Sequence, residues 1–509
     1  MSTAVVVILL STCLHALAET SDPKDQIGHY KRLRNELFQK ELEMMLGSDI
    51  VLTDNEQKAN DIIMELKNAV VDDGFTNPRH FNFSKHFFEY KDQLTDTMLY
   101  RILRDMPKGA LLHAHDTGIL AAEYVLNITY WDDLYVCRVE DEIEYLFSSN
   151  TPIKYCKTKW VPMKEVRYTS GNVKKFDSDL IRRFSIVVDD PAAEYPDINT
   201  VWSKFSNYFI STTPLLTYKP AWEFYFYETL KAAREEGIMY VEIRSVLPSL
   251  YDLNGEIYSS VDTAKSYKDV LDKFMKNFPD FYGAKLIYAP HRRVSDETVE
   301  QYVQIAQQIK RKMPDFLAGF DFVGQEDLGR PLAEIAPQVL ELAAEMNFIF
   351  HAGETNWYGK SSDENIIDAI ALGTKRIGHG YAITKHPALM EEVKNRDIAL
   401  EVNVVSNAVL GLVADVRNHP LATMMARGLP VVLSSDDPGV WGADILTHDY
   451  YVAFVAVASR HADLRLLKKL AKNSLYYSTI SDKDKALHEF EIRWTKFIGR
   501  LLKDKWSYF

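Results

Sequence analysis

The sequence has no excess of positive charge, no low-complexity tract and no short tandem repeat. Its 59 lysines and arginines are outnumbered by 72 aspartates and glutamates, which gives a formal net charge of −13. Such a chain has no electrostatic footprint for nucleic acid, so we expect no nucleic acid partner and a small, neutral ligand instead. Core-forming residues are abundant, because 47% of the 509 residues are hydrophobic, which is typical of a globular protein with a large core.

Long apolar runs are scarce near the N-terminus. The run there covers only residues 5–10, far fewer than the roughly 20 residues that span a bilayer. Together with the small-x-small pattern of Ala16 and Ala18, it predicts a cleavable secretory signal over residues 1–18, with cleavage near Glu19. A buried N-terminal strand or a membrane anchor is the alternative. The signal predicts a secreted, extracellular protein without a membrane span.

Cysteine is scarce as well, with three in the whole chain. Cys13 would leave with the signal, so the mature protein would keep Cys137 and Cys156 alone. In an oxidising compartment an even pair favours one disulfide, although two unrelated buried thiols are the alternative. Sequons at Asn82 and Asn127 predict N-glycosylation in the same compartment.

Residues 19–105 have the apolar spacing of amphipathic helices and no evident chemistry. We expect an N-terminal helical region that covers the catalytic core or pairs two subunits. The simpler alternative is a packed layer of surface helices.

From residue 106 onward, short apolar runs alternate with longer helical stretches. We expect strands over eight of these runs: 109–115, 238–245, 284–290, 317–324, 347–354, 376–380, 398–406 and 430–437. Near-continuous apolar strands separated by helices are typical of a parallel sheet buried on both faces. Eight such units predict an α/β fold, a (β/α)8 TIM-type barrel whose catalytic part spans residues 106–126 and 191–509.

The interval between the first two strands is much longer than the others and rich in aromatic residues. We interpret residues 127–190 as a subdomain inserted after the first strand and held by the Cys137–Cys156 disulfide. Catalytic residues of barrels lie where strands lead into such loops, so the insertion would sit over the active site and bind substrate or a receptor.

Polar residues end several of the expected strands. His113 and His115 are one residue apart at the end of the first strand, so their side chains point to the same face. A His-x-His pair alone is a weak signal, but His351 and Asp436 end two further strands of the same barrel. Imidazoles and a carboxylate are suitable zinc ligands, so we predict one Zn2+ per subunit, held by these four residues and water.

Proton-transfer residues are expected beside these ligands. Glu354, three residues beyond His351 in "HAGE", would be kept protonated by desolvation and act as an acid. His379, between two glycines in "IGHG", is expected to be the base or the electrostatic partner of the activated water. Asp437 is free to accept hydrogen bonds from water or substrate.

The motifs "HAHD", "HAGE", "IGHG" and "SSDDP", in this order, resemble those of the adenosine deaminase branch of the metal-dependent amidohydrolases. The stretches "MPKGALLHAHDTG", "VWSKF", "HAGETNW", "RIGHG" and "DVRNHP" are more specifically similar to the secreted adenosine deaminase 2 and adenosine deaminase-related growth factor family. The likeness covers nearly the whole mature chain. One departure is Asn403-Val404, where the family often has Cys-Pro; it lies outside the expected catalytic set, so activity should survive.

The resemblance implies a zinc enzyme that hydrolyses adenosine, and 2′-deoxyadenosine, to inosine and ammonia. It implies the same four zinc ligands, with Glu354 as the acid that protonates the purine ring and His379 as the base. It also implies a set of substrate contacts, which fall on Asp116, Trp202, His291, Gly324 and Asp437. A homodimer built on the N-terminal helices and growth-factor activity through adenosine depletion are further expectations.

Two other interpretations stay open at this point. The chain could be a barrel amidohydrolase that acts on a different purine or amide. It could instead be an extracellular growth factor that binds a receptor or glycan independently of catalysis. We favour the enzyme because all the proton-transfer residues are present. The cytidine-type zinc deaminases are excluded, since their "PCxxC" ligands are absent from the sequence.

Overall fold

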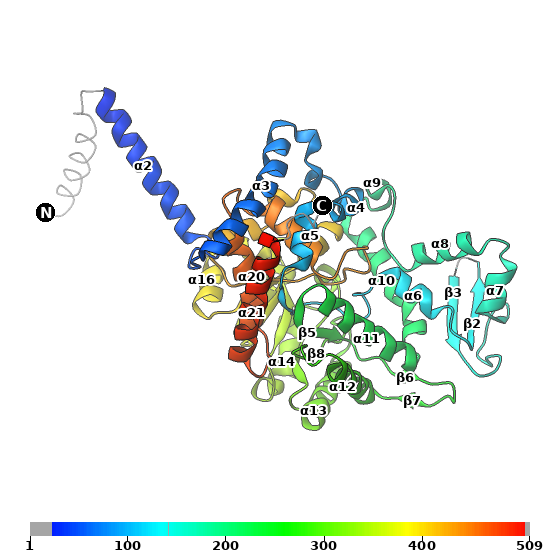
Figure 1. The fold of residues 1–509 in the computed structure, drawn as a ribbon. Helices are drawn as coiled ribbons and strands as arrows, with labels where there is room; N and C mark the ends of the chain where they lie inside the picture. The colour runs from blue at the N-terminus through cyan, green and yellow to red at the C-terminus, as the bar shows by residue number, and fades with distance from the viewer. Residues whose placement is uncertain (1–22, 141, 504–509) are drawn as a thin grey trace.

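The computed structural model describes residues 23–140 and 142–503. The predicted signal, its cleavage site and Cys13 lie outside the described residues. Figure 1 shows a central barrel, a small lobe beside it and one long helix that projects away from the body. Among the described helices, none is both long and apolar enough to cross a bilayer.

Eight parallel strands form the barrel, in the eight places that the sequence predicts. They are β1 (Gly109–Leu111), β5 (Ile238–Ser245), β8 (Ala284–Tyr288), β9 (Leu317–Phe320), β10 (Ile349–Ala352), β11 (Arg376–His379), β12 (Ala399–Val402) and β13 (Val431–Leu433). Hydrogen-bonded neighbours run β1-β5-β8-β9 and β10-β11-β12-β13. Parallel bridges between Phe320 and Phe348 and between Ala114 and Asp436 join the two halves. The predicted (β/α)8 fold is confirmed.

Most strands end earlier than the sequence predicts, and the difference falls at the polar ends. β1 stops at Leu111 and β13 at Leu433, each before the polar residues that follow. His379, the last residue of β11, and Asp436 have φ angles of 58° and 64°, which lie in the left-handed region and turn the chain out of the strand. The candidate site residues therefore lie at the ends of the strands or on the bends that follow them.

Amphipathic helices cover the outside of the barrel. The main ones are α11 (Lys219–Glu235), α12 (Ser260–Asn277), α13 (Asp296–Lys312), α14 (Leu332–Val339), α15 (Ser361–Ala371), α16 (Pro387–Asn395), α18 (Leu421–Ala426), α20 (Leu464–Tyr476) and α21 (Lys483–Lys503). α12 illustrates why they form where they do: Ser259 and Asp262 make a capping box at its start, and Val270 and Phe274 on one face are buried.

Shorter elements lie in the loops that follow the strands. They are β6 (Leu250–Tyr251), β7 (Ile257–Tyr258), η4 (Glu326–Leu328), η5 (Leu340–Ala344), η6 (Tyr381–Lys385), α17 (Val404–Val409), η7 (Val416–Asn418), α19 (Thr447–Val452) and η8 (Ala453–Val457). β6 and β7 pair as an antiparallel hairpin. α17 follows β12 directly, so this helix begins at the polar end of the barrel.

An N-terminal helical region precedes the barrel. Its elements are α2 (Pro23–Met44), α3 (Asp54–Thr76), η1 (Pro78–His80), η2 (Asn82–Ser84), η3 (Phe87–Glu89), α4 (Lys91–Thr95) and α5 (Met98–Asp105). α3 begins with a capping box of Thr53 and Glu56, and Glu56 also accepts hydrogen bonds from Lys468 and Trp494 of the barrel helices α20 and α21. α3 is thus fastened to the barrel, whereas α2 projects from it (Figure 1).

A lobe follows the first strand, as the sequence predicts. It contains α6 (Ala122–Ile128), β2 (Leu134–Val139), β3 (Glu142–Phe147), β4 (Trp160–Pro162), α7 (Met163–Thr169) and α8 (Val173–Arg183), and α9 (Pro191–Glu194) and α10 (Ile198–Leu216) lead back to the barrel. The three strands pair antiparallel in the order β3-β2-β4. Cys137 and Cys156 form a disulfide with a Cα–Cα distance of 5.9 Å. The predicted disulfide is confirmed, and the alternative of two free thiols is wrong.

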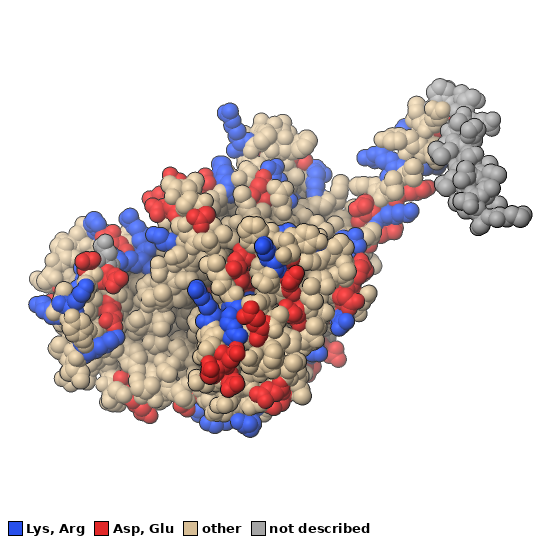
Figure 2. Space-filling model, turned by 180° about the vertical axis from the view of Figure 1, so that it is seen from behind, with Lys and Arg blue, Asp and Glu red and all other residues tan. Residues whose placement is uncertain are grey.

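Charges of both signs cover the surface. Seen from behind, Lys and Arg side chains are interspersed with Asp and Glu over the barrel and the lobe (Figure 2). This distribution agrees with the acidic net charge of the sequence.

Candidate metal and catalytic site

The four predicted metal ligands meet at one end of the barrel. Their ligand atoms all lie within 4.8 Å of one another. Asp436 Oδ1 is 3.0 Å from His115 Nε2 and 3.4 Å from His113 Nε2. His113 Nε2 is 3.1 Å from His351 Nε2. Ligand atoms at about 2.0–2.2 Å from one zinc ion are separated by about 3–3.5 Å, so the spacing fits a shared ion.

Two buried carboxylates fix the tautomers of His113 and His351. Glu401 Oε2 lies 2.8 Å from His113 Nδ1, and Asp321 Oδ2 lies 2.6 Å from His351 Nδ1. An ionised carboxylate can only accept, so each Nδ1 donates and each Nε2 presents a lone pair. The two Nε2 lone pairs face each other across 3.1 Å and repel unless a cation lies between them. This donor set fits a divalent metal such as Zn2+.

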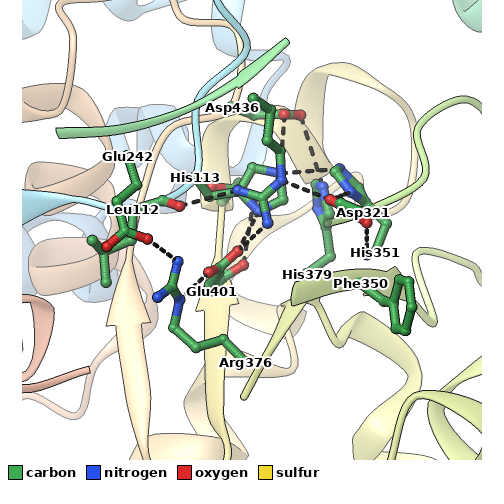
Figure 3. A network of polar contacts seen from close by, with 12 residues as sticks. Leu112, His113, Glu242, Asp321, Phe350, His351, Arg376, His379, Glu401 and Asp436 are labelled. Atoms are coloured by element: carbon green, nitrogen blue, oxygen red, sulfur yellow. Dashed lines mark hydrogen bonds and ion pairs between the residues drawn. The ribbon is translucent and has the colours of Figure 1, made fainter. Parts of the chain in front are cut away.

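A buried arginine, Arg244, links these two carboxylates. Figure 3 shows Asp321 beside His351 and Glu401 beside His113. Arg244 donates from Nε to Asp321 Oδ2 at 2.8 Å and from Nη2 to Glu401 Oε2 at 2.7 Å. Burial alone would raise the pKa of Glu401, but Arg244 and Arg376 hold it well below its ordinary value. At Asp321, His351 and Arg244 likewise outweigh burial and lower the pKa. Both carboxylates therefore stay ionised and act as acceptors for the metal-site histidines.

Backbone shape brings the imidazoles together. The left-handed conformations of His379 and Asp436 each cost about 1–3 kcal/mol and turn the chain at the two strand ends that carry these residues. Gly378 makes a close approach possible, because a Cβ on it would lie 2.9 Å from His113 Cε1 and 3.2 Å from His351 Cα. A larger residue at position 378 would push the His113 ring out of the cluster.

Glu354 is buried beside the ligand cluster, where the sequence predicts an acid. Burial raises the pKa of its carboxyl well above the ordinary value, and Asp436 and Glu326 add to the rise. Glu326 also positions the backbone, since it accepts hydrogen bonds from the amides of Gly353 and Glu354. Glu354 Oε1 lies 3.5 Å from His379 Nδ1. The raised pKa favours the protonated form of Glu354, beside the ligand cluster.

The buried Asp437 and the half-buried Asp116 are two further carboxyls of the site. Burial raises the pKa of Asp437 well above its ordinary value, and the charges of Asp436 and Asp116 raise it further. Burial also raises the pKa of Asp116, whose Oδ2 accepts a hydrogen bond from Tyr267 at 2.5 Å. Asp437 Oδ1 is buried and has no hydrogen-bond partner among the described residues, so it is free for a bound molecule.

The remaining predicted substrate residues lie on the loops and the helix around the site. His291 follows β8 and forms a parallel bridge with Val323. Partial burial lowers the pKa of its imidazole, and the charge of His115 lowers it further. Gly324 has a φ of 105°, a conformation that favours glycine. Trp202 lies on α10, with its ring edge-on to Phe205. The roles of these three residues stay predictions.

Several residues of the site were not predicted from the sequence. They are Arg244, Asp321, Glu326, Arg376, Glu401, Ser406, Asn407 and His419. One signal could have found some of them, because Glu401 and Arg244 are charged residues inside apolar strands, where a charge is seldom buried without a partner. Ser406 donates to Asp436 Oδ2 at 2.7 Å from α17, a helix that carries no such signal.

A closed (β/α)8 barrel whose polar end gathers three histidines, an aspartate and a buried glutamate of raised pKa is typical of a metal-dependent hydrolase. Comparison with known proteins makes this more specific. The family model described as Adenosine deaminase matches residues 146–490, and the one described as Adenosine/AMP deaminase N-terminal matches residues 5–103. The chain belongs to the adenosine deaminase family.

Relatives agree with this assignment, and a solved structure has a similar fold. The chain is 41% identical to "Adenosine deaminase" of Phlebotomus duboscqi, over 99% of this chain and 98% of that protein. It is 39% identical to human "Adenosine deaminase 2", over 92% of this chain and 93% of that protein. Its fold is similar to that of an adenine deaminase from Arthrobacter aurescens, with a TM-score of 0.55 and 20% identity over 77% of this chain and 99% of that one.

Proposed function

We propose that this protein is a secreted, zinc-dependent adenosine deaminase that converts adenosine, and 2′-deoxyadenosine, to inosine and ammonia. One observation carries the proposal: a buried Glu354, whose pKa is raised, lies beside three imidazoles and a carboxylate whose ligand atoms all lie within 4.8 Å of one another. Membership of the adenosine deaminase family supports the substrate class.

The net reaction adds water at C6 of the purine and releases ammonia from the same carbon. When bound by His113, His115, His351 and Asp436, Zn2+ would lower the pKa of a water molecule from about 15.7 toward about 7. Glu354 holds the proton that the ring nitrogen N1 takes up as the C6–O bond forms.

Other residues orient the reactants. Asp437, with an oxygen free of partners, is placed to hydrogen-bond the purine. Asp116, held by Tyr267, would contact the substrate together with Trp202, His291 and Gly324. His379 either accepts a proton from the attacking water or donates a hydrogen bond to its oxygen.

Secretion is proposed from the N-terminal signal pattern and supported by the Cys137–Cys156 disulfide, which belongs to an oxidising compartment. Asn127 is exposed at the end of α6 and is accessible for N-glycosylation. Asn82 is half-buried, and its side chain is hydrogen-bonded to Gln93, which makes it the less accessible of the two sequons. Glycan mapping by mass spectrometry tests both.

A homodimer through α2 is part of the proposal. This projecting helix exposes a stripe of large apolar side chains: Ile27, Tyr30, Leu33 and Leu37. An exposed apolar stripe of this kind is covered in a stable protein, and a second copy of α2 is the simplest cover. Sedimentation should give a dimer for the wild type and a monomer after Leu33→Glu with Leu37→Glu, with Lys40→Glu as control. A monomeric wild type would contradict this part.

Growth-factor activity is proposed to follow from adenosine depletion, with residues 127–190 shaping substrate access and offering a receptor or glycan surface. Glu354→Gln distinguishes growth stimulation by adenosine depletion from growth stimulation by receptor or glycan binding. If this variant keeps its metal but loses growth stimulation, depletion is the cause; full stimulation would place signalling in receptor binding.

The decisive assay follows the ultraviolet change from adenosine to inosine with purified protein, with and without a chelator. We expect turnover that the chelator abolishes and added Zn2+ restores. Glu354→Gln should bind zinc normally and lose nearly all turnover, while the exposed control Glu300→Gln keeps it. Wild-type activity in Glu354→Gln would remove the acid assignment.

A further inference from the structure

We propose that Asn407 and His419 are positioning residues that hold His379 in the tautomer with its proton on Nε2. The ring then presents an N–H, and not a lone pair, toward the metal ligands. This inference deepens the proposed function and rests on it only for the consequence in catalysis; the tautomer itself is a property of the folded chain.

The backbone amide of Leu421 has a fixed proton position and sets the hydrogen-bond directions of its neighbours. Leu421 N donates to His419 Nδ1 at 3.0 Å. An imidazole nitrogen that accepts a hydrogen bond carries no proton, so His419 holds its proton on Nε2. His419 is buried, with 2% of its surface exposed, and its Nε2 lies 3.0 Å from Asn407 Oδ1.

The orientation of the Asn407 amide follows from this. Since His419 Nε2 donates, the atom that faces it must be the amide oxygen and not the amide nitrogen. Asn407 Nδ2 then faces His379 Nδ1 at 3.0 Å. An amide NH2 group can only donate, so His379 Nδ1 must accept.

His379 is thereby left with one place for its proton, which is Nε2. This atom faces the ligand cluster, 3.9 Å from Asp436 Oδ2, and the ring centroid lies 4.8 Å from that of His113 (Figure 3). Nδ1, on the other side of the ring, lies 3.5 Å from Glu354 Oε1.

The consequence is a choice between the two roles left open for His379. In the resting protein Nε2 donates a hydrogen bond to the oxygen of the attacking water and orients it, and it is not free to take up a proton. The neighbouring Ser406 donates to Asp436, so consecutive residues of α17 orient a metal ligand and the catalytic histidine.

Neutron diffraction from deuterium-exchanged crystals of the zinc-loaded protein tests the tautomer without reference to any substrate. We expect deuterium on Nε2 and none on Nδ1 of His379, and deuterium on Nε2 of His419. Deuterium on His379 Nδ1 would overturn the inference. Because this measurement needs no turnover, it stands apart from the outcome of the adenosine assay.

Asn407→Asp tests the consequence with an isosteric change. Its carboxylate still accepts from His419 but also accepts from His379, which moves the His379 proton to Nδ1. We expect kcat to fall on the order of 100-fold or more, with little change in KM and in metal content, as when a catalytic imidazole is held in the wrong tautomer. Asn60→Asp is the matched control: Asn60 is also buried, and its acceptor bond from the Leu464 amide is kept. An unchanged kcat in Asn407→Asp would overturn the inference.

Discussion

Gly118 lies directly against Asp437, so that a Cβ on the glycine would fall 1.8 Å from Asp437 Oδ1. Gly118 lies in the loop that follows the first strand. Because the added methyl group and Asp437 Oδ1 cannot occupy the same space, Gly118→Ala must displace the Asp437 side chain. We predict that kcat/KM for adenosine falls about 10- to 100-fold, because a misplaced substrate contact is worth roughly 1–3 kcal/mol. Steady-state kinetics on the zinc-loaded variant checks this.

Gly499→Ala is the matched control for this substitution. A Cβ on Gly499, in the C-terminal part of α21, meets nothing within 4 Å. It should leave kinetics unchanged and raise helix stability by up to about 1 kcal/mol. If Gly118→Ala behaved like Gly499→Ala, Asp437 would not be a substrate contact.

Asp321→Asn should weaken metal binding without touching a ligand atom. Asp321 accepts hydrogen bonds from Arg244 Nε, from the His351 amide and from His351 Nδ1 through both of its oxygens. An asparagine has only one oxygen that accepts, so it no longer holds the proton of His351 on Nδ1. We predict a 10- to 100-fold loss of zinc affinity, the usual effect of losing a hydrogen-bond partner of a metal-bound histidine. Competition with a chromogenic chelator measures it. Asp72→Asn, in an exposed ion pair with Arg460, is the control, and equal affinity in both variants would refute the role of Asp321.

Glu56 should make the attachment of α3 sensitive to acid. Burial alone would raise its pKa, but hydrogen bonds from Lys468 and Thr53 lower it from 4.5 to about 2. The unfolded chain therefore takes up a proton at a higher pH than the folded one. The stabilisation by Glu56 is complete above about pH 4.5 and is lost as pH falls toward 2.

Glu56→Gln accordingly should lower the free energy of unfolding by about 1–2 kcal/mol at pH 7 and by much less near pH 2.5. Denaturant unfolding at both pH values measures the difference. A loss of equal size at the two pH values would show that shape, and not charge, makes Glu56 stabilising.

The disulfide should stabilise the lobe and not the barrel. Cys137 and Cys156 are separated by 19 positions, and closing such a loop stabilises the folded segment by roughly 3 kcal/mol. In Cys137→Ser with Cys156→Ser, hydrogen exchange should accelerate in β2 and β3 and stay unchanged in the barrel strands. Faster exchange in β10 or β11 would show that the disulfide also supports the site.

The features that could be predicted from the sequence are those that depend on residues close together in the chain. Apolar runs marked the eight strands, and His113 and His115 marked the metal site because the ligands follow strands whose ends meet in a barrel. The strand ends were placed too late, since the left-handed conformations of His379 and Asp436 leave no trace in hydrophobicity.

Contacts between distant segments could not be predicted. Arg244 was visible as a charge in an apolar strand, but only closure of the barrel brings it to both Asp321 and Glu401. Asn407 and His419 lie in a helix and a loop with ordinary polar residues. Their function depends on hydrogen-bond directions, which a sequence does not record.

The central claim is that His113, His115, His351 and Asp436 bind one zinc ion. Anomalous diffraction at the zinc edge, from crystals of the purified protein supplied with Zn2+, tests it most directly. We expect one anomalous peak per chain, at about 2.0–2.2 Å from the three Nε2 atoms and one oxygen of Asp436. A peak held by other residues, or none at this cluster, would contradict it.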